Sequence, residues 1–163
     1  MKRILTVVVL VLTVAWVGFI FSNSLKTGVE SDNASSTVHT VVNEVAQSLG
    51  AKQEISHKTI RTSAHFTEFA VLSALLCLDI MLLVSLSPAD ALSREHTYLL
   101  LSLPASVLIA GIDELLQFFT PGRAMQLIDV LVDACGALCG MLVFLAVFAI
   151  AHATKRPRKD KKI

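Results

Sequence analysis

The sequence has little charge and lacks the short motifs that identify common enzyme sites. Of its 163 residues, 17% are charged and 6% are aromatic, with one Trp and one Tyr. No CxxC, GxGxxG, P-loop or HExxH pattern occurs, so the redox, dinucleotide, nucleotide and metalloprotease sites that these motifs mark have no support. No internal repeat is visible, and no nucleophile with an adjacent base is evident.

The three cysteines do not indicate a disulfide framework. Cys77, Cys135 and Cys139 all fall inside apolar runs. Cys135 and Cys139 are one turn apart on one predicted helix, so we interpret them as small packing residues rather than as a disulfide or a metal pair.

The abundant feature is hydrophobicity, at 54% of the residues with a mean hydropathy of +0.68. A helix needs about 20 apolar residues to cross a hydrocarbon core about 30 Å thick. Four stretches approach this, at 4–22, 64–86, 97–119 and 127–152. A soluble helical bundle is the alternative, but its helices would carry polar stripes on their exposed faces. We predict an all-α integral membrane bundle of four transmembrane helices.

Both ends of the chain are predicted to be cytoplasmic. The first apolar run follows Lys2 and Arg3, but it is long and no A-x-A site follows it, so we expect a retained span rather than a cleaved signal peptide. Nine basic residues then fall on one side of the membrane and five on the other, and the richer side is cytoplasmic by the positive-inside rule. We predict a multi-pass domain in the cell membrane over 1–154 and a basic cytoplasmic tail over 155–163.

An amphipathic helix is predicted outside the membrane, between the first two spans. The segment 35–50 can be capped by Ser35 or Ser36 and can end at Gly50. We expect His39 and Glu44 on its solvated face. The opposite face, which should lie on the membrane surface or over the bundle, carries apolar residues at helical spacing: Val38, Val41, Val42, Val45 and Leu49.

Ionisable residues converge at the outer ends of the predicted spans. Residues three or four apart share one helix face, and each of the last three spans carries such a group. We interpret four residues as candidate catalytic acids and bases, namely His65, Glu68, Asp113 and Glu114. Five more are candidate binding or structural residues, namely Arg61, Gln117, Arg123, Asp129 and Asp133. Below them Gly136 and Gly140, four residues apart, predict close packing of the last span against another helix.

The cluster is either a set of interhelical contacts or a functional site. Hydrogen bonds between membrane helices contribute only about 0.6 kcal/mol each, whereas a charge at mid-bilayer costs several times more. This comparison favours a functional site. Five acids there outnumber two arginines, so we expect the arginines to be paired with acids. Protons, a bound cation or a cationic group on a substrate should relieve the remaining charge, and a metal held by His65 and nearby acids stays open.

One more acid lies deeper in the second span. Asp79 is on the face of Glu68, and Ser102 and Ser106 lie on the Asp113 face of the third span. We expect a buried, protonated Asp79 hydrogen-bonded to one of these serines. It is the one feature that favours a proton-coupled transporter.

Four short motifs lie along the predicted spans: "WVGFIFSNS" followed by "ES", then "RTSAHFTEF", "DELLQFFTPGR" and "DVLVDACGALCG". They resemble motifs of the VanZ-like family of small bacterial membrane proteins. The family pattern is K/R-x-x-H-x-x-E-[YF], D-E-x-x-Q-x-x-x-P-x-R and D-x-x-x-N-x-x-G-x-x-x-G. Here Arg61 lies one residue further from His65, and Asp133 stands where the family usually has Asn.

The resemblance implies a cell-envelope protein and a link to resistance against the glycopeptide antibiotic teicoplanin. Three classes of function remain: binding or modification of a cell-wall or lipid-linked substrate, proton-coupled transport, and a non-catalytic membrane scaffold. We expect the lipid bilayer and a cell-wall or lipid-linked substrate as partners, and no nucleic acid. The cofactor, the metal and the oligomeric state are left open, as is whether the protein is an enzyme.

The topology prediction can be tested by cysteine labelling in intact cells. Lys52→Cys should react with a membrane-impermeant maleimide added outside, and Lys159→Cys should react only after the membrane is permeabilised. The reason is the asymmetry of basic residues. Labelling of position 159 from outside would overturn this orientation.

Overall fold

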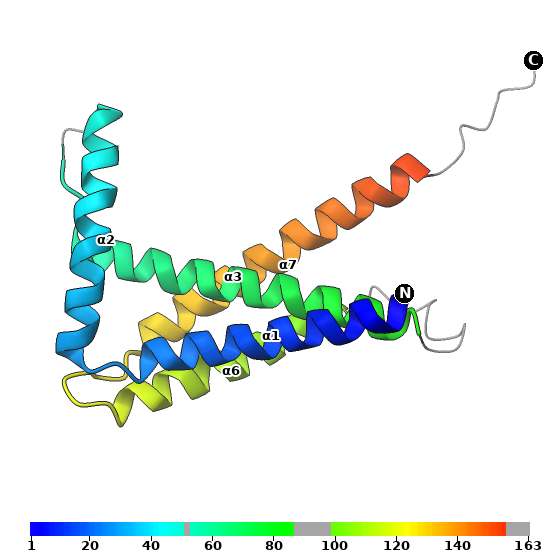
Figure 1. Ribbon diagram of the computed structural model, residues 1–163, viewed down its shortest axis with the longest axis horizontal. Coiled ribbons are helices and arrows are strands. Elements are labelled where there is room, and N and C mark those ends of the chain that lie inside the picture. Colours follow the sequence, from blue (N-terminus) through cyan, green and yellow to red (C-terminus); the bar gives the residue numbers. More distant parts are fainter. Residues whose placement is uncertain (51–52, 87–98, 156–163) are drawn as a thin grey trace, which may run out of the picture.

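In the computed structural model, residues 1–50, 53–86 and 99–155 are described, with side chains to residue 151. This part of the chain contains no strand, which confirms the prediction of an all-α protein. Its helices are shown in Figure 1 and are α1 (Lys2–Ser24), α2 (Gly28–Ser48), α3 (His57–Val84), α6 (Ser102–Phe118) and α7 (Leu127–Lys155). Residues 156–163 of the predicted basic tail, and residues 87–98 before α6, lie outside the described residues.

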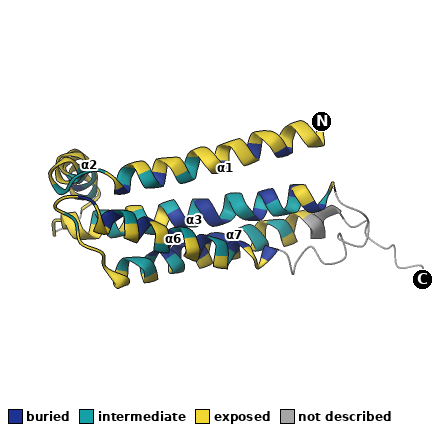
Figure 2. Cartoon of the chain, turned by 90° about the horizontal axis from the view of Figure 1, so that it is seen from below, coloured by how far each residue is buried: buried dark blue, intermediate teal, exposed yellow. Residues whose placement is uncertain are grey.

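Four helices form the body of the molecule, and α2 lies across one end of it (Figure 1). That end holds the last turn of α1, the first turn of α3 and the connection from α6 to α7. The first residue of α1 and the end of α7 both lie toward the opposite end (Figures 1 and 2). The two ends of the helical body are therefore distinct, and the polar residues predicted to converge do so at the α2 end.

Three helices are long and apolar enough to cross a membrane: Lys2–Ser24, His57–Val84 and Leu127–Ala151. The fourth predicted span, 97–119, is shorter in the structure, where α6 has 17 residues. Figure 2 shows that much of α1 is exposed, and its exposed surface is apolar, including Ile4, Val7, Val11 and Val14. A water-soluble bundle rarely leaves so large an apolar surface uncovered, so the exposure favours the membrane.

The packing of α3 against α7 depends on two glycines. A Cβ atom on Gly136 would collide with the backbone carbonyl of Phe66, and one on Gly140 would collide with that of Ala70. Both glycines are buried, and their neighbours are backbone atoms that cannot rotate away. The two helix backbones therefore approach as closely as only glycine allows.

Helix α2 begins seven residues earlier than its predicted first residue. Thr27, not Ser35 or Ser36, is the N-cap, and it forms a capping box with Glu30. The Thr27 backbone N–H and then its hydroxyl bind the Glu30 carboxylate and hold its pKa below the ordinary value. In this T-x-x-E pattern the Thr27 hydroxyl accepts from the Glu30 N–H, and the Glu30 carboxylate accepts from the Thr27 N–H. These two reciprocal hydrogen bonds start the helix before its row of apolar residues begins.

The apolar row of α2 faces away from the bundle. Val38, Val41, Val45 and Leu49 are all at least half exposed, and Gly50 with a φ of +93° follows the last turn. His39 does not lie on a solvated face as predicted: its side chain is 14% exposed, stacks on His57 and lies 3.7 Å from Glu54. Packing against the start of α3 therefore outweighs hydration of this imidazole.

Helix α2 is tied to the body near both of its ends. The Gly28 N–H donates to the Pro121 carbonyl over 3.1 Å. Further along, the Asn43 amide donates to the Ile55 carbonyl at 3.1 Å and accepts from the Ile55 N–H at 2.7 Å. These bonds hold α2 across the ends of α1 and α3.

The deep acid has a different partner from the predicted one. Asp79 is buried, but it accepts a 2.6 Å hydrogen bond from Thr13 of α1, not from a serine of α6. Ser106 instead donates to the Ser102 carbonyl, and the Cys77 thiol lies 3.1 Å from the Ser102 hydroxyl. Helix α1 thus contributes the neighbour that α6 was expected to supply.

The prediction for the other two cysteines is also wrong. Cys135 and Cys139 are exposed, because the buried face of α7 is the one that carries Gly136 and Gly140. They do not pack inside the bundle.

We predict that Gly140→Leu destabilises the protein strongly, since overpacking a tight contact typically costs about 1–3 kcal/mol and here the obstacle is backbone. Thermal unfolding in detergent measures the effect. Val143→Leu on the exposed face of α7 is the control and should be close to wild type. Equal stability of the two variants would contradict the α3–α7 packing.

Candidate functional site

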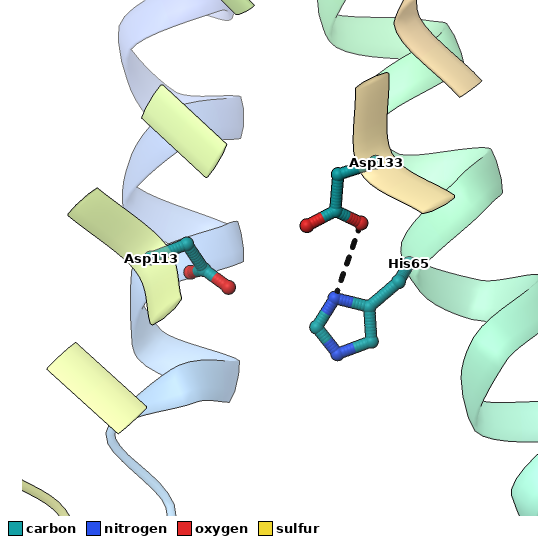
Figure 3. Close-up of side chains that lie close together, drawn as sticks. All are labelled: His65, Asp113 and Asp133. Atoms are coloured by element: carbon teal, nitrogen blue, oxygen red, sulfur yellow. Dashed lines mark ion pairs between the residues drawn. The ribbon is translucent and has the colours of Figure 1, made fainter. Parts of the chain in front are cut away.

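Three side chains from three helices meet inside the α2 end of the bundle. His65 comes from α3, Asp113 from α6 and Asp133 from α7 (Figure 3). One nitrogen or oxygen atom of each lies within 4.8 Å of the others. Both aspartates are fully buried, and the His65 side chain is 12% exposed. The predicted face-sharing residues are therefore brought together around one point.

The His65–Asp133 pair is held loosely. Its Nδ1 and Oδ1 atoms are 3.5 Å apart, which is long for a hydrogen bond. Neither Asp133 oxygen, nor the Nδ1 atom of His65, has a hydrogen-bond partner among the described residues. Asp133 is consequently a buried carboxylate that lacks the hydrogen bonds such groups almost always have.

The neighbouring acids on α6 are firmly bound. Asp113 accepts from the Ser24 hydroxyl at 2.6 Å and from the Gln117 amide at 3.1 Å. Glu114 accepts from the same amide at 3.1 Å and from the backbone N–H of Gln126 at 2.8 Å. Glu114 thus fastens the turn before α7, whereas Asp113 is oriented toward His65 and Asp133.

The last acid of the predicted cluster, Glu68, is held by α1. Its carboxylate accepts from the Asn23 amide at 3.0 Å, and Asn23 in turn accepts from Lys26 at 2.9 Å. The indole N–H of Trp16 donates to the Glu68 carbonyl at 3.0 Å. These bonds fix the position of α3 along α1.

A cavity of about 220 Å³ opens beside this cluster. It lies between the end of α1, helix α2 and the start of α3, and His65 and Glu68 are part of its wall. Three cationic side chains also line it, namely Lys26, Arg61 and Arg123, whereas Asp113, Glu114 and Asp133 do not. The charges are therefore sorted, with the cations at the cavity wall and most of the acids buried behind it.

The expectation that both arginines are paired with acids holds for one of them. Arg61 lies 3.8 Å from Asp129. Arg123 has no carboxylate within ion-pair distance among the described residues and donates to the Ser31 hydroxyl of α2 at 2.6 Å. Burial, and then the nearby Arg61, hold the pKa of Arg123 below its ordinary value, but a guanidinium still stays protonated. The turn before α7 thus places Arg123 against α2, where its hydrogen bond is to a hydroxyl and not to a carboxylate.

The motifs "WVGFIFSNS" and "ES" contain residues of α1 and α2 that contribute to the site, but the sequence alone did not assign them to it. Asn23 and Ser24 hold the two acids, and Ser31 binds Arg123. The signal was the polar "SNS" at the end of an uninterrupted apolar span, where ordinary surface residues give the same pattern.

Comparison with protein families identifies the chain. The model of the VanZ/LLP1 family matches residues 9–149. The chain belongs to this family. The match includes most of α1, the residues that line the cavity and all three residues of Figure 3, which agrees with the resemblance in the four motifs. No curated protein and no solved structure matches the chain.

We predict that Ser24→Ala destabilises the protein by about 1–3 kcal/mol, because it leaves buried Asp113 without its shortest hydrogen bond. Denaturation of the purified protein measures the change. Ser22→Ala removes an exposed hydroxyl that binds only the Phe19 carbonyl, and it should have little effect. A loss at Ser22 as large as that at Ser24 would contradict the role assigned to the buried bond.

Proposed function

We propose that this VanZ/LLP1 family member is a cell-envelope membrane protein that binds a lipid-linked, phosphate-bearing headgroup in the cavity beneath α2. In this proposal α6 is a fourth span, both termini are cytoplasmic, and the cavity faces outward at the membrane surface. The observation that carries it is that Lys26, Arg61 and Arg123 line one cavity and Arg123 has no carboxylate partner among the described residues.

The electrostatics of the cavity wall support an anionic ligand. Glu68 is the one acid among the lining residues, and it already accepts a hydrogen bond from Asn23. Because Arg61 already lies 3.8 Å from Asp129, the excess positive charge of the wall comes mainly from Arg123 and Lys26. Guanidinium groups bind phosphate through paired, charge-assisted hydrogen bonds, which makes phosphate the anion best matched to Arg61 and Arg123.

The apolar part of the wall supports a ligand that also carries a lipid chain. Ala34 and Val38 of α2 and Ile60 and Ala64 of α3 line the same cavity as the cations. Val38 belongs to the exposed apolar row of α2. A ligand whose charged head binds the cations could therefore keep its chain along α2 and in the bilayer.

The cavity also limits which predicted catalytic residues can touch a ligand. His65 and Glu68 line it, and Glu114 is occupied by Gln126 and Gln117. If the protein acts on its ligand, His65 is the group positioned to exchange a proton with it. Glu114 then has a structural role.

The two other function classes have weaker support. The transporter hypothesis depends on Asp79, whose carboxylate is bound by Thr13 and is not one of the residues that line the cavity. A scaffold needs neither a cavity nor an unpaired arginine. A link to teicoplanin resistance would follow if the ligand were a lipid-linked cell-wall precursor.

Binding of a polyprenyl phosphate to the protein in nanodiscs, compared with the corresponding neutral polyprenol, tests the proposal. The phosphate should bind and the alcohol should not. Arg123→Gln should weaken binding about 10- to 100-fold, since a hydrogen bond to a charged group contributes about 1.5–3 kcal/mol. Arg123→Lys should retain part of the affinity because the positive charge remains.

Lys58→Gln is the matched control. Lys58 is a cation on the first turn of α3 that does not line this cavity, so its loss should leave binding unchanged. Equal binding of the alcohol and the phosphate would overturn the proposal. A loss of binding in Lys58→Gln as large as that in Arg123→Gln would also overturn it. Both variants would then report a general attraction of the ligand to the charged membrane surface of the protein.

A further inference from the structure

The buried point where α3, α6 and α7 meet has the composition of a metal site. It offers one imidazole from His65 and one carboxylate each from Asp113 and Asp133, with the three ligand atoms within 4.8 Å of one another (Figure 3). Metal–ligand bonds of about 2.0–2.2 Å place two ligands of a tetrahedral ion about 3.3–3.6 Å apart. The three ligand atoms would therefore have to move toward the ion by up to about 0.7 Å each to share one coordination shell.

An independent observation indicates that a ligand is missing from this point. Asp133 is 0% exposed, and neither of its oxygens has a hydrogen-bond partner among the described residues. The imidazole of His65 is 3.5 Å away, and its facing Nδ1 atom also lacks a hydrogen-bond partner. A buried carboxylate without hydrogen bonds is costly, so these atoms should share a ligand that can satisfy them.

The charge of the three groups selects a divalent cation. Two ionised aspartates and a neutral histidine carry two negative charges, which one divalent ion cancels. A proton shared by His65 and Asp133 would compensate only one of these charges.

The surroundings of Asp113 resemble the outer shell of a metal site. Ser24 and Gln117 each donate to one of its oxygens, which fixes the carboxylate and leaves further lone pairs free. Such outer-shell hydrogen bonds orient ligands in known metal sites. Ser24 and His65 also line the cavity, so the buried point lies directly behind its wall.

We propose that His65, Asp113 and Asp133 bind one divalent transition-metal ion, Mn²⁺ or Zn²⁺. One nitrogen and two carboxylate oxygens suit these ions, whereas Mg²⁺ and Ca²⁺ prefer oxygen ligands alone. The three ligands are an imidazole and two carboxylates, so the proposed site contains no thiol ligand. The ion is part of the resting protein, and its binding does not depend on the ligand of the cavity.

The test is the metal content and thermal stability of the protein purified in detergent without a metal-chelating tag. Elemental analysis should find about one Mn or Zn per chain. EDTA treatment should lower the melting temperature, and Mn²⁺ or Zn²⁺ added in excess of the chelator should restore it. A metal-free wild type whose melting temperature responds to neither ion would overturn the proposal. This arm needs no variant and no lipid.

Variants locate the ion. Asp133→Asn and His65→Gln should lose the metal, with affinity reduced by about 100-fold or more, because even outer-shell changes cost about 10- to 100-fold. Asp133→Asn introduces the residue usual in the family, so it should still fold.

Asp79→Asn is the control for these variants. Asp79 is also a buried acid with one unpartnered oxygen, but it is outside the three-residue group. It should retain the metal. Metal loss at Asp79, or full retention in Asp133→Asn, would place the ion elsewhere and overturn the assignment.

Discussion

The close contact between the backbones of α3 and α7 determines the geometry of the rest of the site. Gly136 lies against the carbonyl of Phe66, the residue that follows His65, and Asp133 is three residues before Gly136. The same contact that joins the helices therefore sets the distance from Asp133 to His65. A side chain at Gly136 would separate the helices and also draw the carboxylate away from the imidazole.

The other helices complete the site by binding acids that α3 and α6 bring inward. The end of α1 supplies Asn23 to Glu68 and Ser24 to Asp113. Buried Asp79 and Glu114 also accept short hydrogen bonds, from Thr13 of α1 and from the backbone N–H of Gln126, so Asp133 alone of the buried acids among the described residues has none. The structure compensates buried charge mainly with neutral donors, and it leaves Arg123 beside the cavity rather than among the acids. The site thus combines a cationic wall with an anionic interior.

The sequence predicted what periodicity and hydrophobicity can determine. The long apolar runs became helices, and residues at helical spacing such as Asp129 and Asp133 lie on one side of α7. Periodicity gives the face of a helix but not the neighbour that the face meets. For this reason Asp79 was assigned to α6 and is bound by Thr13 of α1, and Arg123 was assigned to an acid and binds Ser31 of α2. The sequence did not predict the start of α2, because the residues that follow the Thr27 capping box are mostly polar and show no apolar residues at helical spacing.

The attachment of α2 has a mechanical consequence. Helix α2 is held by hydrogen bonds near each end, through Gly28 and Ser31 at its start and through Asn43 toward its end. Ala34 and Val38, which line the cavity, lie between these points, where the stacking of His39 on His57 is a further contact with α3. A force from the membrane on the exposed valines would therefore reach the wall of the cavity through a helix that is attached at several places along its length.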